Sequence, residues 1–277
     1  MQKKVMEVSC YVAGAGAFGV FLRWLQDQLA FNDAGLPDKS ALHVMVPVYI
    51  VVCALLFRHI VKGYRKAGKR LPESFFEAFR NEGKLYSLLR WVCGGVMAAG
   101  GALLLATSEL DKYAGMLQAL SLVAIVAGLC FPLLMAAANK PGSKLSLLCL
   151  PAFAPLFLYA VWLVYCYRAN SINPVVWSYV LEVFTVIVAL VAFFRVAGFP
   201  FRNPRPERCL FDVMFAAMLC LMSLADERYM GMHMILLGSA LMLLYENWVM
   251  VCNLGPVPEK REEAPAAQER GDGFEHL

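Results

Sequence analysis

The chain has 277 residues, of which 60% are hydrophobic and 17% are charged, and its 25 basic and 21 acidic residues give a net charge of +4. A globular protein is nearer half apolar and one quarter charged, so this composition excludes a soluble globular domain. The nine cysteines form no CxxC pair and the four histidines are scattered, so no spacing supports a disulfide framework or a metal cluster. What remains is a polytopic membrane protein.

A helix needs about 20 apolar residues to cross the hydrocarbon core of a bilayer. Eight segments meet this requirement, so we predict an all-α membrane protein with eight transmembrane helices. In chain order the segments are Val8–Leu29, Ala41–Val61, Leu85–Ala106, Met116–Ala137, Leu145–Cys166, Pro174–Phe194, Cys209–Ala225 and Met232–Cys252.

The distribution of basic residues predicts the orientation of the chain, because lysine and arginine are enriched in cytoplasmic loops. If the N-terminus is cytoplasmic, 20 of the 25 basic residues lie on the cytoplasmic side and five lie on the other side. We therefore expect a multi-pass protein of the cell membrane with both termini in the cytosol. The basic residues lie between apolar segments, so they indicate orientation rather than binding to nucleic acid.

The loop at residues 58–84 is the longest predicted cytoplasmic loop. Its first part, Lys62–Arg70, is basic and favours contact with anionic lipid head groups. The short amphipathic helix that follows carries Phe75, Phe76 and Phe79 on one side, which is typical of an interfacial helix. We expect this helix to anchor the loop in the inner leaflet; the alternative is a docking surface for a cytoplasmic partner.

A weak internal repeat suggests that two halves of four helices each, residues 1–138 and 139–255, are related in parallel orientation. The best match joins Asp111–Met116 to Glu227–Met232, which share an acid, a base, a tyrosine, a glycine and a methionine in order. The alternative is chance similarity among short aromatic and basic pieces. The polar segment at residues 256–277 has no periodic apolar face and is predicted to be a disordered cytoplasmic tail.

The segment Gly14–Gly19 spells the GxGxxG dinucleotide fingerprint, but it lies inside an apolar helix rather than after a strand. We therefore predict no cofactor there and read the small residues as a helix-packing face. In the proposed repeat, Gly14 corresponds to Pro151 and Phe18 to Pro155, so glycines (Gly14 and Gly16) in one half and prolines in the other would weaken the first helix of each half near the midplane. Matching helix interruptions near the midplane are typical of a transporter binding site, although glycine and proline are also simply common in membrane helices.

Charged residues within spans are costly if they face lipid, so they are candidates for function. Glu182 and Glu246 are the deepest, and each could carry a proton or a cation or could hydrogen-bond between helices. Arg23 and Asp27 are spaced i to i+4 near the end of the first span and could pair. These four residues are the candidates for a substrate or ion pathway.

The sequence favours a small-solute transporter of unknown substrate, with one half of the molecule rocking against the other. The alternative is a non-catalytic membrane component, namely a subunit, receptor or assembly factor, that recruits a membrane or cytoplasmic protein through the basic loop and the tail. No catalytic motif is present in the sequence, so neither an enzyme activity nor a cofactor or metal is predicted. One criterion separates the two functions: transport is favoured if Glu182 and Glu246 both point into one central polar cavity, and the membrane component is favoured if they face separate tight helix contacts with no cavity.

Overall fold

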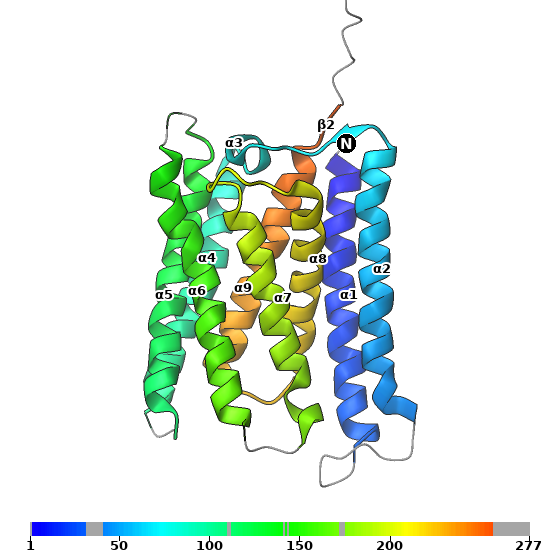
Figure 1. Ribbon diagram of the computed structural model, residues 1–277, viewed down its shortest axis with the longest axis vertical. Helices are drawn as coiled ribbons and strands as arrows, with labels where there is room; N and C mark the ends of the chain where they lie inside the picture. The colour runs from blue at the N-terminus through cyan, green and yellow to red at the C-terminus, as the bar shows by residue number, and fades with distance from the viewer. Residues whose placement is uncertain are drawn as a thin grey trace, which may run out of the picture.

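The chain folds into a bundle of long helices that run side by side, with the connections gathered at its two ends (Figure 1). The computed structural model describes residues 2–31, 41–109, 112–140, 142, 144–171 and 175–256. Within these residues, eight helices are long and apolar enough to cross a membrane. The prediction of an all-α chain with eight such helices is therefore confirmed, and it indicates an integral membrane protein. The predicted tail from residue 257 onward lies outside the described residues.

The eight long helices are α1 (Gln2–Leu29), α2 (Met45–Lys66), α4 (Lys84–Thr107), α5 (Ala114–Ala137), α6 (Leu145–Asn170), α7 (Val180–Ala197), α8 (Pro206–Met222) and α9 (Met230–Cys252). Short elements lie at the ends of the bundle: the 3₁₀ turns η1 (Ala41–Val44), η2 (Val176–Ser178) and η3 (Ser223–Ala225), the helix α3 (Phe75–Ala78), and the strands β1 (Lys69–Arg70) and β2 (Gly255–Pro256).

The sixth span begins later than predicted. The expected start at Pro174 lies outside the described residues, and α7 begins only at Val180. The residues before it form η2, in which the Trp177 ring packs against the rings of Phe31 and His43. These contacts hold the segment at the ends of α1 and α2, so it does not continue the axis of α7.

Helix α2 runs beyond its predicted end at Val61 to Lys66. Its last turn carries Arg65 and Lys66, whose positive charges complement the partial negative charge at a helix C-terminus. Part of the basic loop is therefore ordered helix that projects past the apolar part of the span.

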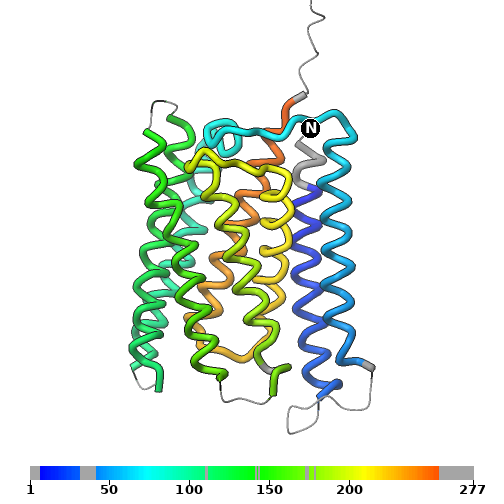
Figure 2. The backbone as a smooth tube through the Cα atoms, viewed as in Figure 1, coloured from blue at the N-terminus to red at the C-terminus, as the bar shows by residue number. Residues whose placement is uncertain are grey.

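Helices α8 and α9 form the centre of the bundle, and most of their residues are buried. Helix α8 packs against α1, α2, α7 and α9, while α9 packs against α1, α4 and α8. Helices α1 and α2 lie on one flank, and α4, α5 and α6 lie on the other (Figures 1 and 2). The other helices therefore surround a core built from the last third of the chain.

Glycines allow α4 to approach two neighbouring helices closely. A Cβ on Gly94 would overlap the carbonyl oxygen of Gly128 in α5, and a Cβ on Gly100 would lie 2.8 Å from the backbone nitrogen of Ile235 in α9. Such close backbone approach is the expected use of small residues in membrane helices. Small residues in this helix therefore serve packing at these positions, whereas Gly95 faces open space.

The predicted halves at residues 1–138 and 139–255 do not correspond to two packing units. In the first half, α1 packs with α2 and α4 packs with α5, but within the described residues neither hairpin has extensive contact with the other. Instead, α1 and α2 pack on α8, and α4 packs on α9. The repeat in the sequence stays a prediction, and the packing gives no support to a rigid first half.

The segment at residues 71–83, here called the cap segment, lies at the end of the bundle where α1 begins and α9 ends (Figure 1). Phe75 and Phe79 are fully buried, and the Phe79 ring packs edge-to-face on Phe199 with ring centres 5.3 Å apart. The expected interfacial helix is therefore wrong, because its aromatic face packs against the bundle and not into lipid. The amphipathic pattern was real, but the apolar surface that it meets is the protein's own.

Hydrogen bonds from three parts of the chain hold the cap segment in place. The Asn253 side chain, after α9, donates to the carbonyl oxygens of Ala78 at 3.0 Å and Arg80 at 2.9 Å. The Asn139 side chain, after α5, accepts from the backbone nitrogen of Asn81 at 2.8 Å. Strand β1, just before the cap segment, pairs with β2 in antiparallel register. The loop is thus an ordered cover over this end of the bundle.

Candidate functional site

The two deepest carboxylates predicted from the sequence lie at different depths in the bundle. Helices α7 and α9 both run away from the end opposite the cap segment, and Glu182 is the third residue of α7 whereas Glu246 is the seventeenth residue of α9. At 1.5 Å per residue, this difference of 14 residues separates them by about 21 Å along the bundle. They therefore belong to two different sites.

Glu182 belongs to a network of four buried charges at the end opposite the cap segment. Arg23 of α1 reaches the segment between α8 and α9, where its Nε donates to Asp226 Oδ1 at 2.7 Å. Each of these two side chains is only 8% exposed. The expected pairing of Arg23 with Asp27 is therefore wrong, because the Arg23 side chain turns into the bundle toward Asp226, while Asp27, one helical turn further along α1, is exposed.

Arg228 extends the network from Asp226 to Glu182. Its Nη2 donates to Asp226 Oδ2 at 2.7 Å, and its Nε lies 3.5 Å from Glu182 Oε2. Its Nη1 also donates to the carbonyl oxygen of Ser223 at 2.8 Å. The order of charges is Arg23, Asp226, Arg228, Glu182, so positive and negative groups alternate and sum to zero. Such an arrangement offsets much of the cost of burying each charge.

Neutral groups complete the hydrogen bonds of Arg23. Its Nη1 donates to Gln26 Oε1 at 2.8 Å, and Gln26 in turn donates to the carbonyl oxygen of His43 at 2.7 Å. Its Nη2 lies 3.5 Å from the carbonyl oxygen of Trp177, to which it donates. The network therefore joins the ends of α1 and α2, the start of α7 and the segment before α9. In this geometry it acts as a clamp that holds four parts of the chain together.

From the network toward the cap segment, stacked aromatic rings fill the interior next to Glu182. Glu182 Oε1 accepts a hydrogen bond from Trp162 Nε1 at 2.9 Å. The Trp162 ring stacks on Tyr159 with ring centres 5.9 Å apart, and Tyr159 stacks on Phe193 at 5.6 Å. All three rings are almost completely buried. We call these three residues the aromatic column; it occupies the space through which a polar path from Glu182 toward the bundle interior would run.

A cleft of about 440 Å³ opens beside the network, lined by Tyr165, Asn170, Glu182, Glu227, Arg228 and Met232 among others. It reaches the two charged groups at one end of the network, Glu182 and Arg228. Because those groups already pair with each other, they present a neutralised pair to the cleft, while Glu227 adds an exposed negative charge that makes no ion pair within the described residues. Glu246 is not among its lining residues.

Glu246 is buried in the core near the other end of the bundle. It is 1% exposed, and its Oε2 has no hydrogen-bond partner within the described residues. On either side of it along α9, the buried Tyr245 hydroxyl and Asn247 Oδ1 also have no hydrogen-bond partner in the described part of the chain, while Asn247 Nδ2 donates to Ser9 Oγ at 3.1 Å. Glu246 lines none of the five clefts described for the molecule. It thus faces close helix packing, not a cavity shared with Glu182.

The two helices that were expected to be interrupted near the midplane are both continuous. Helix α1 is continuous through Gly14 and Gly16, and α6 is continuous through Pro151 and Pro155. A Cβ on Gly16 would lie 2.5 Å from Leu221 Cδ1, so this glycine serves the packing of α1 on α8. The reading of the segment as a small-residue packing face is confirmed at Gly16.

Sequence reasoning missed Asp226 as the centre of the network. Its signal was a polar run, Asp226–Arg228, between two apolar spans, and charges in such a turn usually face water. Only its position opposite Arg23, 203 residues earlier in the chain, makes it an internal group. Within the part of the chain that the structure describes, no group of three or more His, Cys, Asp or Glu residues is arranged to hold a metal ion.

Comparison with known proteins adds no relative to this picture. No protein-family model, no curated protein and no solved structure matches the chain.

Proposed function

We propose that this chain is a non-catalytic membrane component, namely a subunit, receptor or assembly factor, that binds a cytoplasmic protein at the end of the bundle carrying the cap segment. The proposal follows from the criterion set by the two deep carboxylates. Glu182 and Glu246 lie about 21 Å apart along the bundle, given the rise of a helix. Neither carboxylate shares a described cleft with the other.

The observation that carries the proposal is the aromatic column. Trp162, Tyr159 and Phe193 stack next to Glu182, on the side toward the cap segment, with almost no exposed area. A rocking mechanism would need a polar chamber between two rigid halves. In its place, the buried faces of α6 and α7 hold packed rings, and the first four helices are distributed over two flanks. This arrangement supports a fixed scaffold.

The surface for a partner lies at the end of the bundle that carries the cap segment, away from the charge network. Five exposed basic residues, here called the basic surface, lie along the end of α2 and the strand that follows: Arg58, Lys62, Arg65, Lys66 and Arg70. The pairing of β1 with β2 fixes the last part of this surface, and the bonds from Asn139 and Asn253 fix the cap segment that follows it. A surface held in place by the fold loses little conformational entropy on binding, which favours affinity. Its charge favours an acidic partner.

A photo-crosslinking amino acid placed at Lys66 in cells tests this function. We expect a discrete adduct with one protein, and we expect Arg70→Glu in the same chain to weaken that adduct by reversing a neighbouring charge. The matched control places the crosslinker at Tyr167, which is 75% exposed at the other end of the bundle. Adducts with lipid alone at Lys66, or the same adduct from Tyr167, would contradict the proposal.

A gated solute pathway is the second candidate, because the cleft beside the network contacts both Glu182 and Arg228. In this reading the Arg228–Glu182 pair closes one side. A test uses Glu182→Gln in a chain whose exposed native Cys10 is replaced by serine. Alternating access predicts that this substitution increases maleimide labelling of Tyr229→Cys and decreases labelling of Arg208→Cys, at the other end. Unchanged labelling at Arg208→Cys would contradict alternating access, and the network would then have only a structural role.

A further inference from the structure

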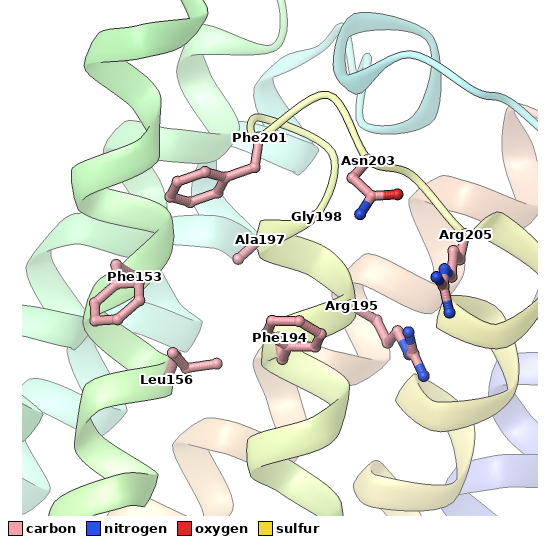
Figure 3. Close-up of a pocket in the computed structure, with 9 residues that line it drawn as sticks. All are labelled: Phe153, Leu156, Phe194, Arg195, Ala197, Gly198, Phe201, Asn203 and Arg205. Carbon is pink, nitrogen blue, oxygen red and sulfur yellow. The ribbon is translucent and has the colours of Figure 1, made fainter.

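Two clefts meet at Arg195, near the end of α7 on the side of the cap segment. One has a volume of about 350 Å³ and lies between α6 and α7, where the loop to α8 closes it (Figure 3). The other has a volume of about 480 Å³ and lies between α2, α7 and α8. Arg195 lines both. This place is separate from the charge network and from Glu246.

The first cleft combines an apolar wall with basic groups. Phe153 and Leu156 of α6 lie at one side in Figure 3, and Arg195 and Arg205 lie at the other. Leu156 is the twelfth residue of α6, so the wall reaches about 16 Å inward from the end of that helix. Phe153 is 45% exposed on the outside of the bundle, which in a membrane is the side facing lipid. The cleft is therefore open toward the acyl chains and polar at the interface.

The charges around both clefts leave an excess of base. Arg195 Nε lies 3.3 Å from Asp212 Oδ2, so these two charges offset each other. Glu207 pairs with Arg65 at 3.6 Å. Arg205 lines the first cleft and Arg208 lines the second, as do Arg58 and Lys62 of α2; within the described residues these four make no ion pair. An anion in the first cleft would meet Arg205, and an anion in the second cleft would meet Arg58, Lys62 and Arg208, without displacing an ion-pair partner.

The start of α8 adds to this preference. The helix begins at Pro206, directly after Arg205, whose side chain makes no hydrogen bond to the first turn. Backbone N–H groups at a helix N-terminus carry partial positive charge and favour a nearby anion. Because α8 has 17 residues, its dipole is fully developed, and it acts together with the arginine side chains.

We propose that this place is a binding site for an anionic phospholipid. The phosphate lies beside Arg205, which makes no ion pair within the described residues, with the Arg195–Asp212 pair next to it, and one acyl chain lies along Phe153 and Leu156. A lipid satisfies both parts of the cleft at once: its head group matches the uncommitted bases, and its tail matches the exposed aromatic and aliphatic wall. Basic pockets between transmembrane helices are a known way to hold anionic head groups. The site goes beyond the proposed function and does not depend on the identity of a protein partner.

Native mass spectrometry of the full chain in detergent tests the site, with phosphatidylglycerol and phosphatidylcholine of the same acyl chains as probes. We expect at least one phosphatidylglycerol to be retained at concentrations that leave phosphatidylcholine unbound. Arg205→Gln should weaken retention about five-fold, because each base near an anionic lipid contributes about 1 kcal/mol. Leu156→Trp, which fills the apolar wall, should weaken it by a similar factor without changing charge.

The control is Arg202→Gln, which removes an exposed arginine from the same loop at a position that lines neither cleft. It should retain phosphatidylglycerol as the unaltered chain does. Equal losses from Arg202→Gln and Arg205→Gln would overturn the site, because they would mean general attraction to a basic face. Equal retention of the two lipids, or displacement by millimolar glycerol phosphate, would also overturn it. Melting temperatures of all variants, measured beforehand, identify any that fail to fold.

Discussion

Asp226 holds two arginines where water reaches little of the three side chains. Arg23 and Arg228 each approach one of its carboxylate oxygens at 2.7 Å. Removing one partner of a buried ion pair leaves an uncompensated charge and is much more harmful than removing an exposed pair. The two arginines would then depend on Gln26, the backbone carbonyls of Trp177 and Ser223, and Glu182.

The first prediction concerns Asp226→Asn. We expect it to lower the free energy of unfolding by about 3–5 kcal/mol, the usual cost of leaving a buried charge without its partner. Unfolding in mixed micelles, followed by circular dichroism, measures the change. Asp27→Asn is the matched control, because it removes a carboxylate from the exposed face of α1 and should be nearly neutral. Equal effects of the two substitutions would mean that the network does not stabilise the fold.

The second prediction concerns Glu246→Gln. The amide keeps the shape of the side chain, and no hydrogen bond to Oε2 within the described residues is lost. Because burying a neutral group costs much less than burying a charge, we expect the melting temperature to stay the same or to rise. Glu246→Ala should lower it by leaving a cavity. A clear fall with Glu246→Gln would show that the carboxylate has a stabilising partner that is charged.

At the residue scale, the sequence was sufficient to recognise costly groups but not their partners. Arg23 and Glu182 stood out because a charge inside an apolar span needs compensation. The nearest available partner for Arg23 was Asp27, one helical turn away, whereas the actual partner is Asp226. Helix periodicity fixes only local neighbours, and a contact across 203 residues depends on how the eight helices pack.

At the scale of elements, neighbouring glycines of α4 lie on different faces of the helix, one packed against α5 and one facing open space. The third prediction compares Gly94→Ala with Gly95→Ala. An added methyl on Gly94 would overlap the backbone of α5 at Gly128, while one on Gly95 meets open space. Overpacking of this kind costs about 1–3 kcal/mol. We therefore expect Gly94→Ala to lower the melting temperature and Gly95→Ala to leave it unchanged. A larger fall for Gly95→Ala than for Gly94→Ala would contradict the close packing of α4 on α5.

The fourth prediction concerns the cap segment. Phe79→Ser removes the ring that packs on Phe199, so the segment should open and become a substrate for trypsin at Arg80 and Lys84. Limited proteolysis in detergent, read by mass spectrometry, measures the rate. Glu77→Ser, on the exposed side of α3, is the control and should leave the rate unchanged. Resistance of Phe79→Ser equal to that of the control would mean that other contacts suffice to hold the segment.

The type of each element was easier to predict from the sequence than the surface against which it packs. Hydropathy identified all eight long helices, because each must be continuously apolar over its span. The amphipathic helix after the basic segment was predicted as well, but its aromatic face was assigned to lipid. Amphipathicity reports that a face avoids water and does not distinguish a bilayer from the end of a bundle.

At the scale of the whole molecule, both ends of the described chain, the start of α1 and the strand β2, lie at the same end of the bundle (Figure 1). The fifth prediction is that this end faces the cytosol, as the distribution of basic residues indicates. A cysteine at Lys66 should resist an impermeant maleimide in intact cells, and one at Lys112 should react, in a chain whose Cys10 is serine. Labelling of Lys66→Cys in intact cells would reverse the orientation.

The distance in sequence between Arg23 and Asp226 has a consequence for biosynthesis. The ribosome adds about 5–20 residues per second, so the arginine is made roughly 10–40 s before its counter-ion. During that interval the first helix must keep its guanidinium near the head groups, where a long side chain can reach water. We expect the nascent helix to lie shallow or tilted until the last hairpin arrives, so a chain that stops after Met222 should remain at the translocon longer than the complete one.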